Sequence, residues 1–192
     1  MRKLKLALAL AGFALAIVVA MVAYNALVDR AEPAARLALP GEQDIPGQEA
    51  QRQRAPDFAL TDWDGNALRF SDIVAGGKPV VLNFWASWCP ACRNEKPGFE
   101  SVYRERGDDV KFVMLGLADG VRETVETGRR HIEANGFTLP VYFDTAREGA
   151  RAHGIRFIPS TVFVDADGYI VTEVQGMVSE EALRRAIDLM LP

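Results

Sequence analysis

The chain has 192 residues, of which 49% are hydrophobic and 25% are charged, and this length suits one globular domain with additional segments. Its formal net charge is −4, and the part beyond Arg54 carries 15 basic and 21 acidic residues. This acidic balance, without a basic stripe after Arg54, argues against nucleic acid as a partner.

The N-terminus has the pattern of a membrane anchor. Arg2, Lys3 and Lys5 precede an uncharged apolar run over residues 6–28 that only Asn25 interrupts. About 20 helical residues cross a bilayer core of roughly 30 Å, whereas the apolar part of a cleaved signal peptide usually has about 7–15. We therefore expect an uncleaved single-pass helix over 6–28 rather than a cleaved signal. By the positive-inside rule, we expect residues 1–5 in the cytoplasm. The chain after the helix would then lie on the extracytoplasmic (periplasmic) side of a bacterial cytoplasmic membrane.

Residues 29–55 have a different composition. Proline and glycine recur among Ala, Gln, Glu and Arg, with no steady hydrophobic period. This pattern is typical of a flexible linker, which would span about 30 Å as a coil. We expect the folded domain to occupy residues 56–192.

The first half of that domain combines strands with one helix. Residues 58–60 and 67–70 flank a turn at 63–66 and predict a β-hairpin. The apolar run at 80–85 predicts a strand covered on both faces. Residues 92–106 predict a helix in which Pro97 is expected to cause a kink.

The second half predicts further alternation of strands and helices. The expected elements are a strand at 111–117, a helix at 121–135 that Gly136 stops, a strand at 141–143, a short helix at 146–153, a hairpin of 161–164 with 169–172 around a turn at 165–168, and a helix from Ser179 to Leu191. This order predicts an α/β sandwich with a central mixed sheet, an N-terminal β-hairpin extension and a preceding transmembrane helix.

The two cysteines form the motif Cys89-Pro90-Ala91-Cys92. Unpaired N–H groups and the macrodipole at a helix start favour a thiolate, and cysteines in such motifs have lowered pKa values. Pro90 fits the first helical position, and the small Ala91 leaves the sulfur atoms approachable. We expect Cys89 to be the outer nucleophile and Cys92 to resolve the mixed disulfide. A static disulfide is the less favoured alternative, because so small a ring constrains little chain.

Other roles for these cysteines lack the required partners. A four-cysteine zinc site needs a second pair, and His131 and His153 are both expected on helix surfaces. We therefore expect no metal site, and no cofactor beyond the redox-active Cys89–Cys92 pair.

The segment Val80–Pro97, which contains Trp-Cys-Pro-Ala-Cys, resembles the active-site segment of the thioredoxin superfamily. It is most similar to the TlpA/ResA branch of membrane-anchored thiol–disulfide oxidoreductases. The motifs Pro56-Asp57-Phe58, Ile158-Pro159 and Asp165-x-Asp-Gly168 occur in the order which that branch shows. The resemblance covers about residues 55–192 and implies a thioredoxin-like fold.

The resemblance also implies roles for individual residues. Pro159 matches the cis-proline beside the reactive disulfide, so its neighbour Ile158 would line the substrate groove; an ordinary strand entry is the alternative. Pro90, Ala91 and Trp88 are expected at the same groove, with a packed tryptophan as the alternative for Trp88. Glu95 matches a carboxyl group that transfers protons near the second cysteine; a solvated helix glutamate is the alternative. Asn83 stands where ordinary thioredoxins carry a buried aspartate, so a buried acid–base role would pass to Glu95.

The predicted function is reduction of protein disulfides by this dithiol. The resemblance implies disulfide-containing client proteins, with apocytochrome c as a candidate, and a thiol-reducing electron donor in the membrane. The CcmG/DsbE cytochrome-maturation branch has an acidic residue after its cis-proline, where this chain has Ser160. The alternatives are a disulfide-forming oxidant and, less favoured, a copper-carrying assembly factor. Ala86 occupies the position of the peroxide-activating threonine of peroxiredoxins, which disfavours a peroxidase.

Overall fold

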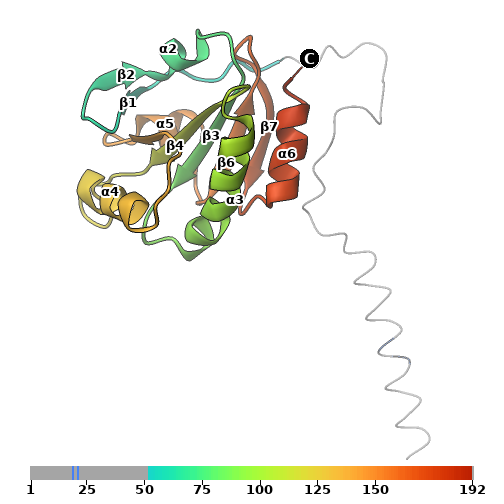
Figure 1. Ribbon diagram of the computed structural model, residues 1–192. Helices are drawn as coiled ribbons and strands as arrows, with labels where there is room; N and C mark the ends of the chain where they lie inside the picture. The colour runs from blue at the N-terminus through green and yellow to red at the C-terminus, as the bar shows by residue number, and fades with distance from the viewer. Residues whose placement is uncertain (1–18, 20, 22–51, 192) are drawn as a thin grey trace, which may run out of the picture. The chain divides into compact units, whose positions relative to one another are not determined.

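The computed structural model describes residues 19, 21 and 52–191 (Figure 1). Val19 and Met21 are helical. The predicted cytoplasmic N-terminus, the rest of the predicted anchor and most of the predicted linker lie outside the described residues. Within the described part, no helix is both long enough and apolar enough to cross a bilayer.

Seven strands of residues 52–191 form one mixed sheet, in the order β2-β1-β5-β4-β3-β6-β7 (Figure 1). The strands are β1 (Ala59–Thr61), β2 (Ala67–Arg69), β3 (Val80–Trp85), β4 (Lys111–Gly116), β5 (Val141–Phe143), β6 (Ser160–Val164) and β7 (Ile170–Gln175). The three central strands β3, β4 and β5 are parallel, and the other pairs are antiparallel. The predicted mixed sheet and the N-terminal hairpin are therefore present.

Helices cover both faces of this sheet because β3 and β4 are apolar on both sides. Val81 and Trp85 of β3 pack in one core cluster with side chains of α3 (Pro90–Arg106), α4 (Val125–Ala134) and α6 (Glu180–Asp188). Leu82 and Phe84 pack in a second cluster with side chains of α2 (Phe70–Val74) and α5 (Glu148–Ala152). The sheet is therefore the middle layer of a three-layer sandwich.

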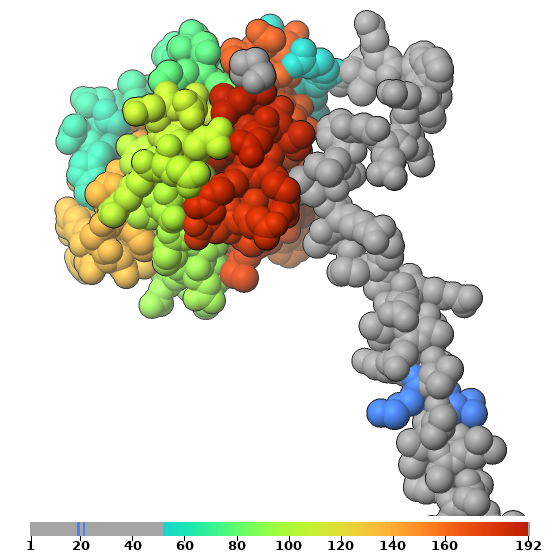
Figure 2. Space-filling model, turned by 45° about the vertical axis from the view of Figure 1, so that its right-hand side comes forward, coloured from blue at the N-terminus to red at the C-terminus, as the bar shows by residue number. Residues whose placement is uncertain are grey.

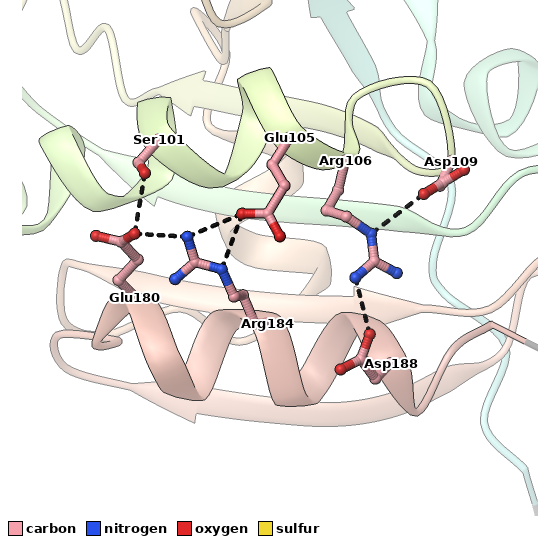
Figure 3. Close-up of polar contacts among 7 residues, drawn as sticks. All are labelled: Ser101, Glu105, Arg106, Asp109, Glu180, Arg184 and Asp188. Carbon is pink, nitrogen blue, oxygen red and sulfur yellow. Dashed lines mark hydrogen bonds and ion pairs between the residues drawn. The ribbon is translucent and has the colours of Figure 1, made fainter.

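Helices α3 and α6 run side by side in the same direction, and both are visible on the surface in Figure 2. Their facing sides bury Phe99 of α3 and Leu183 of α6 in the core. Polar contacts border this apolar seam (Figure 3). Arg184 contacts both Glu105 and Glu180, at 2.9 and 2.7 Å. The pair with Glu105 joins α6 to α3, whereas the pair with Glu180 lies within α6. Such exposed ion pairs contribute little, and burial of the apolar seam supplies most of the stability.

The start of α4 differs from the prediction that placed it at Val121. The carboxylate of Asp119 accepts hydrogen bonds from the backbone N–H groups of residues 121, 122 and 123, at 2.9, 2.8 and 3.0 Å. The helix begins only at Val125, after Thr124 caps it through a hydrogen bond from Thr127 N at 3.1 Å. The side chain of Asp119 thus satisfies N–H groups in a turn and delays the helix.

Two other helices are shorter than predicted. Helix α5 covers five residues rather than 146–153, and α6 ends at Asp188 rather than Leu191. Helix α2 was not predicted, because its five residues are too few to show a hydrophobic period. The carboxylate of Asp57 accepts the N–H of Ser71 in that turn at 2.9 Å.

Both histidines are half-buried and pack against aromatic rings, so they are less exposed than the prediction of helix-surface positions implies. The ring of His153 lies 5.7 Å from the ring of Phe58 and 5.6 Å from that of Phe84, between centroids. Both of its nitrogens are buried without a hydrogen-bond partner among the described residues, and burial lowers the pKa of His153 to about 4. The ring of His131 lies 5.9 Å from that of Trp85, and its Nε2 is buried.

Candidate active site

The Cys89–Cys92 pair lies where β3 ends and α3 begins. Cys89 is the N-cap of α3, Pro90 is its first residue, and the two sulfur atoms form a disulfide. The backbone N–H of Cys92 donates to Cys89 Sγ at 3.1 Å, so one unpaired donor of the helix start points at the sulfur. Cys89 is 4% exposed and Cys92 is 1% exposed. Both residues are thus buried, and Cys89 is slightly more exposed than Cys92.

The loop before β6 lies against this disulfide. The Ile158–Pro159 peptide bond is cis, and the carbonyl oxygen of Ile158 is 3.7 Å from Cys89 Sγ. The carbonyl oxygen of Pro159 accepts the N–H of Gly176 at 2.8 Å, which ties the loop to the end of β7. Ile158 is half-buried and Pro159 is buried. The structure therefore brings together the cysteine motif and the proline motif, which are about 70 residues apart in the sequence.

Glu95 is buried one helical turn after Cys92, between α3 and the sheet. Its Oε1 accepts a hydrogen bond from Asn83 Nδ2 at 2.9 Å, and its Oε2 accepts the backbone N–H of Val178 at 3.0 Å. Asn83 also donates to Thr161 Oγ1 at 3.0 Å. Burial raises the pKa of the Glu95 carboxyl to about 7, although these donors and the charge of Lys96 oppose the rise. Glu95 is therefore not a solvated helix residue, and its carboxyl group gains and loses a proton near neutral pH.

The remaining predicted groove residues surround the disulfide. Trp88 is 37% exposed, and the guanidinium of Arg122 lies 3.4 Å from the centroid of its ring. Pro90 is exposed and Ala91 is half-buried, both at the start of α3. Trp88 and Pro90, the two neighbours of Cys89 in the sequence, are thus exposed, while Cys89 itself is buried.

Three further residues near the site escaped the sequence analysis. Arg122 and Glu123 belong to the turn before α4, which the sequence had predicted to be helical. Glu123 Oε2 accepts hydrogen bonds from the N–H and the hydroxyl of Ser87, at 3.0 and 2.6 Å, and so holds the turn before Cys89. Lys96 is buried next to Glu95. In the sequence, only the spacing of Asp119 and Glu123 before the helix cap Thr124 hints at this turn, and such a spacing is a weak indication.

This geometry suits thiol–disulfide exchange. A strand end and a helix start hold two sulfur atoms at bonding distance, one of them more accessible, beside a carboxyl group that titrates near neutrality. The sulfur atoms supply the two-electron chemistry, and the carboxyl group can carry a proton.

Comparisons with known proteins agree with this site. Residues 52–173 match the AhpC/TSA family. The thiol-disulfide oxidoreductase ResA of Geobacillus kaustophilus (strain HTA426) is 30% identical over 141 residues, covering 72% of this chain and 76% of the relative.

Solved structures give the same result. A thiol:disulfide interchange protein of the thioredoxin family from Chlorobium tepidum TLS has a TM-score of 0.65 and 27% identity, covering 76% of this chain and all of that one. StoA from Bacillus subtilis has a TM-score of 0.59 and 28% identity, covering 69% of this chain and 96% of that one. The chain therefore belongs to the AhpC/TSA family and, within it, to the ResA-type thiol–disulfide oxidoreductases of thioredoxin fold.

Proposed function

We propose that this protein is a membrane-anchored reductase of protein disulfides that works on the extracytoplasmic side of a bacterial membrane. The single observation that carries the direction is the environment of Cys89 Sγ. One N–H points at it, but it is largely buried and the Ile158 carbonyl oxygen is 3.7 Å away. Burial and a facing oxygen atom both disfavour a thiolate. A reduced pair that is not held as a thiolate gives up its electrons more readily.

Exchange follows from the different exposure of the two sulfur atoms. Cys89, as a thiolate, attacks a client disulfide; a bond forms between Cys89 Sγ and one client sulfur, and the other client sulfur leaves and takes up a proton. Cys92 then loses its proton and attacks Cys89 Sγ, which releases the second client thiol. The client gains two electrons and the pair becomes the observed disulfide. A dithiol donor in the membrane would restore the reduced pair by the same exchange.

Glu95 is the group that we propose for the proton in the resolving step. Residues three apart on a helix are neighbours, so Glu95 lies beside Cys92. With a pKa raised to about 7 by burial, its carboxylate can accept the Cys92 proton and its acid form can return one. Asn83 cannot transfer a proton, and it orients the Glu95 carboxyl group instead.

Exposed apolar side chains next in sequence to residues of the site support one kind of client. Within residues 52–191, the exposed large hydrophobic side chains are Trp88, Val121, Phe157, Met177 and Leu189. The first four, which we call the apolar rim, are each next in sequence to a residue of the site. These neighbours are Cys89 of the disulfide, Arg122 against Trp88, Ile158 against Cys89 and Val178 against Glu95. Such a rim suits unfolded polypeptides that expose apolar residues beside a disulfide. Apocytochrome c is one candidate of this kind.

Mixed-disulfide trapping tests this function in the full-length chain within its own membrane. Cys92→Ser leaves the attacker without a resolver, so it is expected to accumulate adducts with client proteins that a thiol reagent releases. Cys89→Ser is the matched control and is expected to collect none. Adducts on Cys89→Ser alone would reverse the two roles, and adducts on neither variant would refute the proposed activity toward proteins.

A further inference from the structure

Lys96 is a charged residue in the protein core. Its side chain is 1% exposed, and its Nζ lies 3.6 Å from the centroid of the Trp85 ring. Lysine is almost never fully buried unless an opposite charge or a π-face compensates its ammonium group. Trp85 is the last residue of β3, four residues before Cys89, so this buried cation lies under the strand that leads into the redox motif.

The groups around Lys96 come from three elements. On α3 itself, Glu95 precedes it and Arg93 lies one turn before it; the turn before α4 supplies Glu123, with Asp119 close to that carboxyl group; α4 supplies His131. Burial lowers the pKa of Lys96 to about 7, and the negative charges of Glu95 and Glu123 oppose this fall. Conversely, the charge of Lys96 lowers the pKa of both carboxyl groups against the effect of burial.

Glu123 connects this charge to the turn that carries the nucleophile. Its Oε2 accepts two hydrogen bonds from Ser87, whereas its Oε1 is buried without a hydrogen-bond partner among the described residues. An ionised carboxylate accepts such bonds best. A carboxylate with one unpaired buried oxygen needs a nearby positive charge to stay ionised, and Lys96 is the buried cation that acts on it.

We propose that Lys96 is a positioning residue of the redox site, whose ammonium group under the Trp85 ring couples the charge of Glu95 to that of Glu123 and thereby to the Ser87 turn in front of Cys89. The effect of this coupling on rate rests on the proton-transfer role proposed for Glu95. The coupling itself does not depend on that role, because it is only the electrostatic interaction among the buried side chains of Lys96, Glu95 and Glu123.

The direct test is the titration of the Glu95 carboxyl group in the full-length protein, followed by NMR of ¹³C-labelled glutamate and assigned from the signal that Glu95→Gln removes. Lys96→Met keeps an unbranched apolar chain over Trp85 but removes the charge. A lost opposite charge at close range shifts a carboxyl pKa by about one unit or more. We therefore expect the Glu95 midpoint to rise in Lys96→Met, by up to about one pH unit.

Two controls separate charge from packing. Lys96→Arg retains a cation and is expected to leave the midpoint near that of the unmodified protein. Lys78→Met removes an exposed lysine just before β3 begins, at the far end of the strand from Trp85, and is expected to change nothing. An unmoved midpoint in Lys96→Met, or equal shifts in the Met and Arg variants, would overturn the proposal.

A measurement without substitution covers the case in which Lys96→Met does not fold. The ¹³Cε signal of Lys96 in the unmodified protein reports its own charge. The proposal requires a charged Lys96 while Glu95 titrates, so a Lys96 that loses its charge below the pH range of the Glu95 titration would refute it. If the midpoint of Glu95 shifts as expected but the exchange rate does not follow, the coupling stands and the proton-transfer role of Glu95 fails.

Discussion

The side-chain amide of Asn83 donates a hydrogen bond to the carboxyl group of Glu95 at 2.9 Å, inside the interface between β3 and α3. The strand position that holds an acid in ordinary thioredoxins thus holds a fixed donor here, and the titrating group is on the helix. The other oxygen of Glu95 accepts the N–H of Val178, so the carboxyl group also connects α3 to the segment before α6. Protonation of Glu95 therefore affects both the redox site and the packing of two helices.

Replacing Glu95 by Gln tests its role in proton transfer. We expect the exchange rate of the unmodified protein to change with pH around 7, where Glu95 titrates. General acid–base catalysis is worth about 10²-fold or more, and Glu95→Gln should lose this gain together with the inflection near pH 7. Stopped-flow exchange with a small disulfide measures it. Glu105→Gln, an exposed change on the same helix, is the control, and an unaltered pH profile in Glu95→Gln would contradict the role.

The same substitution has a predicted effect on stability. Because the pKa of Glu95 is raised from 4.5 to about 7, the folded state binds more protons than the unfolded state between these values. The free energy of unfolding therefore falls as pH rises from 4.5 to 7, by about 3 kcal/mol from this group. His153 and other groups titrate in both proteins, so urea unfolding at both pH values should show this loss as a change in the stability difference between the unmodified protein and Glu95→Gln. Parallel losses in the two proteins would show that another group is responsible.

His153 should have the opposite dependence. Burial lowers its pKa from 6.5 to about 4, so the unfolded state binds more protons in that window. The stability that it contributes is lost as pH falls from 6.5 to 4. Phenylalanine fits among the rings of Phe58, Phe70 and Phe84. His153→Phe should therefore gain stability relative to the unmodified protein as the pH is lowered, measured by thermal unfolding at pH 7 and pH 4.5. A constant difference between the two proteins would contradict the buried, neutral state of His153.

The α3–α6 seam allows apolar packing to be weighed against ion pairs. Leu183 is fully buried, and Leu→Ala changes in such positions cost about 2–5 kcal/mol. Arg184 makes two ion pairs at the exposed border of the seam, and such pairs are worth about 0–1 kcal/mol (Figure 3). Urea unfolding of Leu183→Ala and Arg184→Ala should differ accordingly. A larger loss in Arg184→Ala would mean that the polar border, and not the core, holds α6 in place.

The sequence was sufficient for the parts of the fold that depend on local pattern. The continuous apolar run of β3 predicted a strand buried on both faces, and Asp165–Gly168 predicted the turn between β6 and β7. The order of elements followed from these segments. The sequence pattern did not reveal the start of α4. The side chain of Asp119 accepts hydrogen bonds from backbone N–H groups in the segment that was predicted to be helical.

The candidate site was predictable in its sulfur chemistry but not in its buried charges. Cys89, Cys92 and Pro159 lie in motifs that can be read without a structure. Lys96 and Glu123 do not, because a lysine on a helix and a glutamate in a turn are usually solvated. Their burial arises from tertiary contacts with Trp85 and Ser87, which no local pattern encodes. The burial of His153 was not predicted for the same reason.

The reduction potential of the Cys89–Cys92 pair in the full-length protein tests the central claim most directly, by equilibration with a defined thiol buffer. A pair that donates electrons to protein disulfides is predicted to have a potential near that of thioredoxin, about −270 mV. A value near about −120 mV, typical of a disulfide donor, would contradict the reductase and favour the oxidant.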